Sequence, residues 1–218
     1  YLADAYKGVN VYFPYPGTLP EDWPTDVSLP EKRPNERFRQ VAYLGLSHFV
    51  KPLQGSVETS YRFSHDDFGI LANTLTVQWH QKIGRTLTVS PLFRYYRQTE
   101  SDFYATRFVG DSSYPNGVKV AYQNGEYVDF EGGPAYPSNP AGYDIIQIPA
   151  LPKNYSADYR LSAFEAFTFG VELHWKIQDR VSFNFGYKRY EMCGLNGVTW
   201  KDAYPKAHVV TVGCGLWF

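Results

Sequence analysis

Apolar and polar residues alternate at a period of two in seven separate stretches, and this pattern constrains the fold of the chain more than any other feature. The stretches are 39–50, 56–64, 74–83, 86–96, 166–176, 181–188 and 209–218. Successive side chains of a β-strand point to opposite faces of the sheet, so this alternation predicts strands with one apolar and one polar face. No comparable stretch has the period of a helix. The sequence therefore predicts an all-β protein.

The connections between these stretches alternate between short and long. Short turns are predicted at 51–55, 84–85 and 178–179, and longer polar connections at 65–73, 99–158 and 191–206. Bacterial outer-membrane barrels have short periplasmic turns and longer extracellular loops. The alternative is a soluble sandwich or an up-and-down barrel, which does not need this regular asymmetry. We expect a transmembrane antiparallel β-barrel of the outer-membrane type.

The composition is consistent with such a barrel. Aromatic residues make up 18% of the chain, yet its mean hydropathy is negative. Lipid-facing and lumen-facing residues alternate in a transmembrane barrel, and their hydropathies cancel. No window holds about 18 consecutive apolar residues, so no membrane-spanning helix is expected. The 21 basic and 22 acidic residues nearly balance, which argues against a nucleic-acid partner.

The last predicted strand ends on an aromatic residue. Val210, Cys214, Leu216 and Phe218 share its apolar face. A terminal strand of this kind resembles the closing strand of an outer-membrane barrel, in which the final Phe is part of the signal read by the barrel-assembly machinery. The alternative is a core strand of a soluble sandwich. The chain has no initiator Met and no signal peptide, so we expect Tyr1 to be a processed or truncated start.

The strand count and directions predict a topology. If the last strand runs toward the periplasm, residues 1–37 form an extracellular loop segment, and 38–218 hold the barrel strands with a long extracellular loop at 99–158. That loop shows no obvious secondary structure, and loops of this length are usually functional or disordered. Seven strands cannot close a bacterial single-chain barrel, which has an even number. We therefore expect the chain to supply about seven C-terminal strands of a larger barrel.

The alternation divides the side chains between two environments. Apolar positions are predicted to face lipid: Phe167, Phe169, Val171, Leu173, Val181, Phe183, Phe185, Val210 and Leu216. Polar positions are predicted to line the lumen: Glu58, Arg62, His80, Lys82, Arg94, Glu172, His174, Lys176 and Lys188. Such a set either selects solutes in a channel or simply pairs and stiffens a wet interior.

Metal, cofactor and catalytic sites are not expected. Glu172 and His174 lie only two residues apart on one strand, and no third spaced ligand accompanies them and His80. The acidic residues of the long loop do not have the spacing of a calcium loop: Asp102, Asp111, Glu126, Asp129, Glu131 and Asp144. Neither a nucleophile-elbow motif nor a phosphate-binding loop is present. We expect neither an enzyme nor a bound cofactor.

The two cysteines are predicted to remain unpaired. Cys193 should lie at the extracellular end of the sixth strand, and Cys214 near the periplasmic end of the seventh. About ten residues at ~3.3 Å each separate their levels by roughly 30 Å. A disulfide needs Cα atoms within about 7 Å, so the oxidising envelope cannot join them.

Several segments resemble one family in particular. They are 1–7 (YLADAYK), 31–37 (EKRPNER), 61–70 (YRFSHDDFGI), 92–104 (LFRYYRQTESDFY) and 154–164 (NYSADYRLSAF). In this order they resemble the C-terminal half of a bacterial outer-membrane family known as domain of unknown function number 3570, over the whole chain except about 105–153. The resemblance implies an N-terminal half with further strands. It implies no established activity, although neighbouring genes often encode flavin-attaching and thioredoxin-like proteins.

These observations lead to two hypotheses for function. The first is a porin-like channel, or the membrane anchor of an envelope complex, in the bacterial cell outer membrane. The second is a plugged structural or accessory barrel whose extracellular loops bind a surface protein, with a redox connection suggested by the gene neighbours. The expected partners are outer-membrane lipid, the barrel-assembly machinery and other envelope or surface proteins. A channel should conduct ions, whereas a plugged anchor should not.

Overall fold

The computed structural model describes residues 8–12, 26–110, 114, 116–177 and 180–216. These residues form thirteen strands and three short 3₁₀ turns. No helix among them is long and apolar enough to cross a membrane. The chain divides into two compact units, one of residues 1–35 and 103–158 and the other of residues 36–102 and 159–218. The all-β class predicted from the sequence is confirmed.

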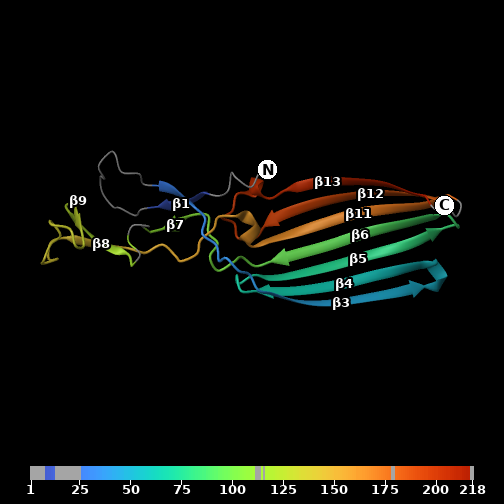
Figure 1. The fold of residues 1–218 in the computed structure, drawn as a ribbon, viewed down its shortest axis with the longest axis horizontal. Helices are drawn as coiled ribbons and strands as arrows, with labels where there is room; N and C mark the ends of the chain where they lie inside the picture. Colours follow the sequence, from blue (N-terminus) through green and yellow to red (C-terminus); the bar gives the residue numbers. More distant parts are fainter. Residues whose placement is uncertain (1–7, 13–25, 111–113, 115, 178–179, 217–218) are drawn as a thin grey trace. The chain divides into compact units, whose positions relative to one another are not determined.

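The second unit is built on one antiparallel sheet of seven strands (Figure 1). The order across the sheet is β13-β12-β11-β6-β5-β4-β3, so β6 and β11 pair although about 65 residues separate them along the chain. The seven predicted stretches are these seven strands. Their bounds are Arg39–Val50 (β3), Gly55–Asp66 (β4), Leu71–Ile83 (β5), Leu87–Gln98 (β6), Phe164–Ile177 (β11), Val181–Gly194 (β12) and Lys206–Leu216 (β13).

The two ends of this sheet differ in their connections. At the turn end, a 3₁₀ turn at Lys51–Leu53 joins β3 to β4, and a tight turn joins β5 to β6. Gly84 in that turn has φ of +65°, a left-handed conformation that glycine adopts without steric cost. At the loop end lie the connections from β4 to β5, from β6 to β11 and from β12 to β13. The β6–β11 and β12–β13 connections are long, as predicted. The β4–β5 connection (67–70) is instead as short as the β3–β4 turn (51–54), because β4 and β5 extend beyond the predicted stretches. The predicted turn at 178–179 lies outside the described residues.

The pairing register keeps apolar side chains on one face through all seven strands. Leu44, Tyr61, Leu75, Tyr95 and Phe167 stand opposite one another from β3 to β11. A shift by one residue would move a whole strand's apolar set to the other face, so the register is specified by the alternation. The sheet consequently has one apolar and one polar face.

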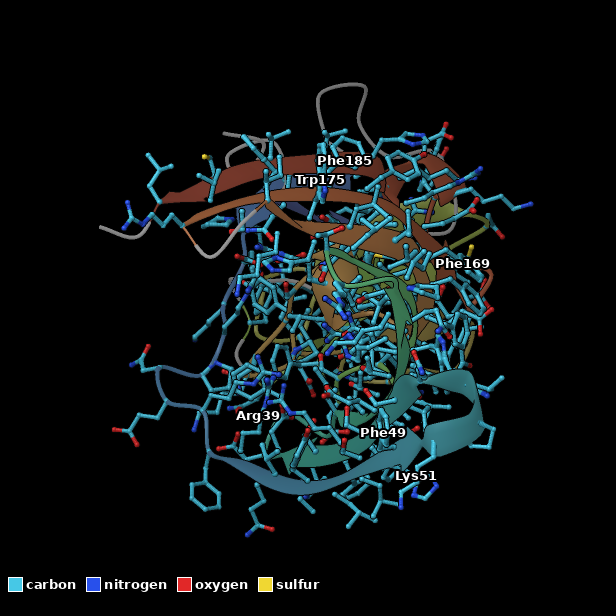
Figure 2. All side chains as sticks on the ribbon, turned by 90° about the vertical axis from the view of Figure 1, so that its right-hand side faces the viewer. Arg39, Phe49, Lys51, Phe169, Trp175 and Phe185 are labelled. Atoms are coloured by element: carbon cyan, nitrogen blue, oxygen red, sulfur yellow. The ribbon has the colours of Figure 1, made fainter. Side chains whose placement is uncertain are left out.

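The sheet is strongly curved, with its polar face on the inside. Figure 2 shows it curling around, with Phe169 and Phe185 outside the curve and Arg39 and Phe49 inside it. The polar side of the strands also contains buried small residues such as Ser90 and Ser182. We call the concave polar surface the inner face and the convex apolar surface the outer face.

The first unit contains strands in both stretches that the sequence predicted as loops. β1 (Gly8–Tyr12) pairs with β2 (Asp26–Pro30) and with β7 (Phe108–Val109). A second small sheet has the order β10-β8-β9 and comprises Asp144–Ile148, Val118–Gln123 and Glu126–Phe130. Its own core consists of Val118, Val120, Tyr122 and Ile148. The prediction that 99–158 lacks secondary structure is therefore wrong, because these strands are too short to show an alternating pattern.

The edges of the large sheet are β3 and β13, and within the described residues neither pairs with a further strand. The sheet is curved but not closed into a barrel by the residues that the structure describes. β3 and β13 run in the same direction, since an odd number of strands alternates between them. The predicted larger barrel therefore stays a prediction.

The cysteines are unpaired, as predicted from the strand directions. Cys193 and Cys214 are both free. Cys214 stands opposite Phe183, close to the turn end, whereas Cys193 stands opposite Glu165 at the loop end. The two levels are ten residue steps apart along β12, which corresponds to roughly 33 Å.

Candidate functional site

All nine polar residues predicted to line a lumen lie on the inner face of the sheet. They share it because the register pairs polar with polar positions from strand to strand: Arg62 stands opposite Tyr43 and Thr74, and Arg94 opposite Thr76 and Thr168. Five adjacent strands contribute the set, namely Glu58 and Arg62 from β4, His80 and Lys82 from β5, Arg94 from β6, Glu172, His174 and Lys176 from β11, and Lys188 from β12.

An ion pair on this face is formed by Glu172 and Lys188. Lys188 Nζ lies 2.7 Å from Glu172 Oε1, although the two residues are diagonal neighbours. The residues directly opposite them are both glycines: Gly170 faces Lys188, and Gly186 faces Glu172. A Cβ on Gly170 would lie 2.7 Å from Lys188 Cγ, so the lysine side chain crosses over this glycine to reach its partner. The pair is half-exposed and contributes little stability, but it neutralises the Glu172 charge.

The second carboxylate of the inner face lies beside a histidine. Glu58 Oε2 is 3.7 Å from His80 Nε2, too long for a hydrogen bond but within ion-pair distance when the imidazole is protonated. His80 Nδ1 is 2.9 Å from Ser90 Oγ. Its Nε2 atom is buried and has no hydrogen-bond partner among the described residues. Glu172 and Glu58 are the two carboxylates in the middle part of the inner face, which we call its wall. Each has a side-chain nitrogen nearby, Lys188 Nζ for Glu172 and His80 Nε2 for Glu58.

A polar groove of about 520 Å³ runs along this part of the inner face. His174 is fixed in its wall, with Nδ1 2.5 Å from Asn184 Oδ1 on the neighbouring strand. His80 and Lys188 also line the groove, together with Thr88 and Thr211. The lining combines hydroxyl, amide, imidazole and charged groups of the inner face with Leu173, Phe185 and Gly186.

Arg62 and Arg94, like Lys82, have no ion-pair partner among the described residues of the inner face. Both side chains are exposed, and neither forms an ion pair with a carboxylate in the described part of the chain. Arg94 borders a hollow of about 320 Å³ together with Tyr96, Thr168 and Tyr190. The guanidinium groups are therefore available to water and to solutes.

Toward the loop end, the inner face changes from polar to aromatic. Phe164, Met192 and Tyr204 are buried there, and the rings of Tyr96 and Phe164 are 5.5 Å apart. Tyr204 is fixed by a hydrogen bond of 2.8 Å between its hydroxyl and that of Ser162. The sequence analysis missed this cluster, because Tyr204 comes from a connection that shows no alternation.

A buried carboxylate joins β3 to the β4–β5 connection at the loop end. Asp66 accepts hydrogen bonds from the Arg37 guanidinium and, at 3.3 Å, from Arg39. It also accepts them from the backbone N–H groups of Phe68 and Ile70, at 3.2 and 3.1 Å. Burial alone raises the pKa of Asp66, but the hydrogen bonds from Arg37 and Ile70 and the Arg37 charge outweigh burial and hold it below its ordinary value. The sequence analysis did not identify this residue as structural.

The outer face contains all the residues predicted to face lipid. They lie on β11, β12 and β13, and many of them are exposed. Charged side chains on this side of β12 and β13 gather at the loop end, where Lys206 Nζ lies 2.7 Å from Glu191 and Arg189 is 3.5 Å from the same carboxylate. Phe218, the predicted assembly signal, lies outside the described residues.

The acidic residues of the long connection are not grouped in the described residues. No cluster of three or more His, Cys, Asp or Glu side chains that could hold a metal ion occurs there. Asp129 instead accepts hydrogen bonds from the backbone N–H groups of Phe130 and Ala135, at 2.9 and 2.7 Å. This carboxylate therefore stabilises a turn of its own unit.

The chain was compared with protein families, curated proteins and solved structures. The family model described as "Protein of unknown function (DUF3570)" matches residues 1–201. The match spans the stretch at about 105–153 that the motifs had left out. Neither the curated proteins nor the solved structures gave a match. Since the family model covers most of the chain, the protein belongs to the DUF3570 family of proteins of unknown function.

Proposed function

We propose that this protein is a β-barrel of the bacterial outer membrane and forms a channel. In this proposal, the outer face of the seven-stranded sheet contacts lipid, and the inner face lines a water-filled lumen. Both edge strands, β3 and β13, pair with further strands that close the barrel, because an open edge in lipid would leave backbone groups without hydrogen bonds at a cost of several kcal/mol each.

The observation that carries the proposal is the outer face itself. Apolar side chains occupy it on all seven strands in continuous register. Many of these side chains are exposed, for example 75% of Val212, 68% of Leu46 and 55% of Phe169. Soluble proteins rarely expose an apolar surface of this extent. A bilayer would bury it, and the alternation of apolar outward with polar inward residues is that of transmembrane barrels.

The proposal includes the partners of such a barrel. Outer-membrane lipid would cover the outer face, and the barrel-assembly machinery would insert the protein into the membrane. Other envelope or surface proteins could bind the unit of residues 1–35 and 103–158. No catalytic role is assigned to any residue.

Two measurements test the proposal. Fractionation of the natural host should place the protein in the outer membrane, and the unboiled protein should migrate differently from the boiled protein in a denaturing gel. The purified full-length protein should then increase the conductance of a planar bilayer in discrete steps. A protein recovered in the soluble fraction would contradict the membrane assignment, whereas a membrane protein without conductance would contradict only the channel.

A second candidate is supported by the aromatic cluster at the loop end of the inner face. Phe164, Met192 and Tyr204 fill space on the side that would be the lumen. If they and the barrel's further strands close the pore, the protein is a plugged accessory barrel that displays its extracellular unit to a surface partner. Smaller side chains at Phe164 and Tyr204 should then open a conductance that the natural protein lacks.

A further inference from the structure

We propose that the lumen of this protein favours anions and that Arg62 and Arg94 are the residues that select them. This inference rests on the proposed channel function and adds the class of solute to it. It is argued from the distribution of charge on the inner face, which differs from that of the chain as a whole.

The charges of the inner face do not balance, although those of the chain do. The whole chain has a formal net charge of −1. Of the nine residues on the wall of the inner face described above, five are basic, two are acidic and two are histidines, a formal charge of +3 with neutral histidine. The remaining charged residues on this face, Arg39 and Asp66, pair with each other at the loop end. The excess positive charge therefore belongs to the wall between the two ends.

Each of the two acidic groups of the wall has a side-chain nitrogen of its own nearby. Glu172 is paired with Lys188 at 2.7 Å, and Glu58 lies 3.7 Å from His80 Nε2. Neither carboxylate reaches Arg62 or Arg94 within ion-pair distance. A passing cation would meet carboxylates that have local partners, whereas an anion would meet two guanidinium groups that have none.

The positions of the two arginines suit a role in selection. Their partners in the register are neutral: Tyr43 and Thr74 beside Arg62, and Thr76 and Thr168 beside Arg94. Two strand spacings separate them across the sheet, on the order of 10 Å. On a concave surface, side chains of this length converge toward the middle. Rings of Arg or Lys are the usual lining of anion-conducting pores.

The hollow beside Arg94 provides hydroxyl groups as well as charge. Tyr190 and Thr168 border it together with Arg94, whereas the hydroxyl of Tyr96, which also lines it, donates its hydrogen bond to Gln98 Oε1 at 2.6 Å. Hydroxyl groups donate hydrogen bonds to anions, and the arginine fork suits a carboxylate or a phosphate. Arg94 is therefore expected to have a larger effect than Arg62 on anions that bear these groups.

Reversal potentials across a gradient of potassium chloride test the inference on the full-length protein. Arg94→Gln and Arg62→Gln should each lower the permeability ratio of chloride to potassium by about tenfold, because one unit charge at ~6 Å in water changes the Boltzmann factors of chloride and potassium by about threefold each, in opposite directions. The shift should shrink at 1 M salt, where the Debye length falls to about 3 Å. Arg94→Lys keeps the charge and should keep the preference, which separates the charge effect from a folding defect.

Arg97→Gln is the matched control, because Arg97 lies three residues along β6 on the opposite face of the sheet. It should leave the ratio unchanged. If the channel conducts but Arg62→Gln and Arg94→Gln do not change the ratio, or Arg97→Gln changes it equally, the inference is wrong and the channel stands. If neither the natural protein nor a variant conducts, the proposed function fails and the inference falls with it.

Discussion

At the scale of single residues, Asp66 organises the loop end of the sheet. Its side chain is 1% exposed and accepts hydrogen bonds from two arginines and two backbone N–H groups. The neighbouring Asp67 is exposed and accepts only one, from the backbone N–H of Phe38 at 3.1 Å. Two adjacent aspartates in one polar segment therefore have different roles. Nothing in the sequence distinguishes them, because the difference arises from where β3 brings Arg37 and Arg39.

Replacing Asp66 with asparagine should lower the free energy of unfolding by about 2–3 kcal/mol, since hydrogen bonds from charged donors contribute more than neutral ones. Urea unfolding of the protein refolded in lipid vesicles measures this difference. Asp67→Asn is the matched control and should change the stability by less than about 0.5 kcal/mol. Equal effects of the two substitutions would mean that the Asp66 cluster does not stabilise the fold.

The same carboxylate predicts a dependence on pH. The pKa of Asp66 is lower in the folded protein than in the unfolded chain, where it is about 3.9. The unfolded state therefore takes up the proton first as the pH falls. The stabilisation is complete above about pH 4 and is lost as the pH falls through the folded-state pKa. The difference in stability between the natural protein and Asp66→Asn should shrink below pH ~4, and a constant difference down to acid pH would exclude this explanation.

At the scale of elements, the β11–β12 hairpin shows how glycines shape the inner face. Gly170 and Gly186 stand opposite the two members of the Glu172–Lys188 ion pair. Without side chains at these positions, the long side chains of the pair can meet across the diagonal. The two glycines differ in the space around them, since an added Cβ at Gly186 would meet its nearest atom at 3.6 Å, an ordinary contact.

Alanine at the two positions should therefore have different effects. Gly170→Ala places a methyl group 2.7 Å from Lys188 Cγ and 3.0 Å from the Tyr187 carbonyl oxygen, so it should destabilise the hairpin by about 1–3 kcal/mol relative to Gly186→Ala. Gly186→Ala should be neutral, or stabilising by several tenths of a kcal/mol, because alanine has less conformational freedom to lose. The comparison uses the urea midpoints of both variants. Similar midpoints would show that Lys188 moves aside without cost.

The hairpin also shows where prediction from the sequence fails. β12 extends six residues beyond Lys188, the last residue that the alternation identified. Its outward positions there are Arg189 and Glu191, which form the charged group with Lys206 instead of continuing the apolar face. An alternation rule detects a strand only while one face stays apolar, so it marks the apolar band and not the full length of the strand.

At the scale of the whole molecule, the outer face should behave as a membrane surface. Val171 lies in the middle row of this face, opposite Pro91 and Tyr187. An arginine there should lower the stability of the membrane-inserted protein by about 2–4 kcal/mol. Thr168→Arg, on the inner face of the same strand, places the same charge in the proposed lumen and should cost far less. Equal costs for the two arginines would argue against contact of the outer face with lipid.

The proposed topology can be tested by labelling single cysteines in intact cells after replacing Cys193 and Cys214 with serine. Val198→Cys in the β12–β13 connection and Asn139→Cys in the 99–158 stretch should react with an impermeant reagent from outside. Arg85→Cys in the β5–β6 turn should react only after the outer membrane is opened. The opposite pattern would invert the proposed orientation, and labelling of all three from outside would rule out a membrane-spanning sheet.

The large sheet could be predicted from the sequence, but the smaller unit could not. Twelve-residue strands repeat their alternation often enough to be recognised, and their register follows from the apolar face. In the smaller unit, β8 has only six residues, so its alternation of Val118, Val120 and Tyr122 with Lys119 and Gln123 is too short to be recognised. The alternation also places the nine polar residues on one face of the sheet, whereas the pairing of Glu172 and the lack of an ion-pair partner for Arg94 depend on side-chain geometry.

The parallel course of β3 and β13 limits how the proposed barrel could be completed. Antiparallel pairing at both edges requires an added segment whose first and last strands run in the same direction as each other, and therefore an odd number of added strands. If two copies of this sheet were instead placed side by side around a common axis, β13 of each copy would pair with β3 of the other. Both of these pairings would be parallel. One continuous insert with an odd number of strands gives an even total and a single antiparallel wall, as in bacterial barrels.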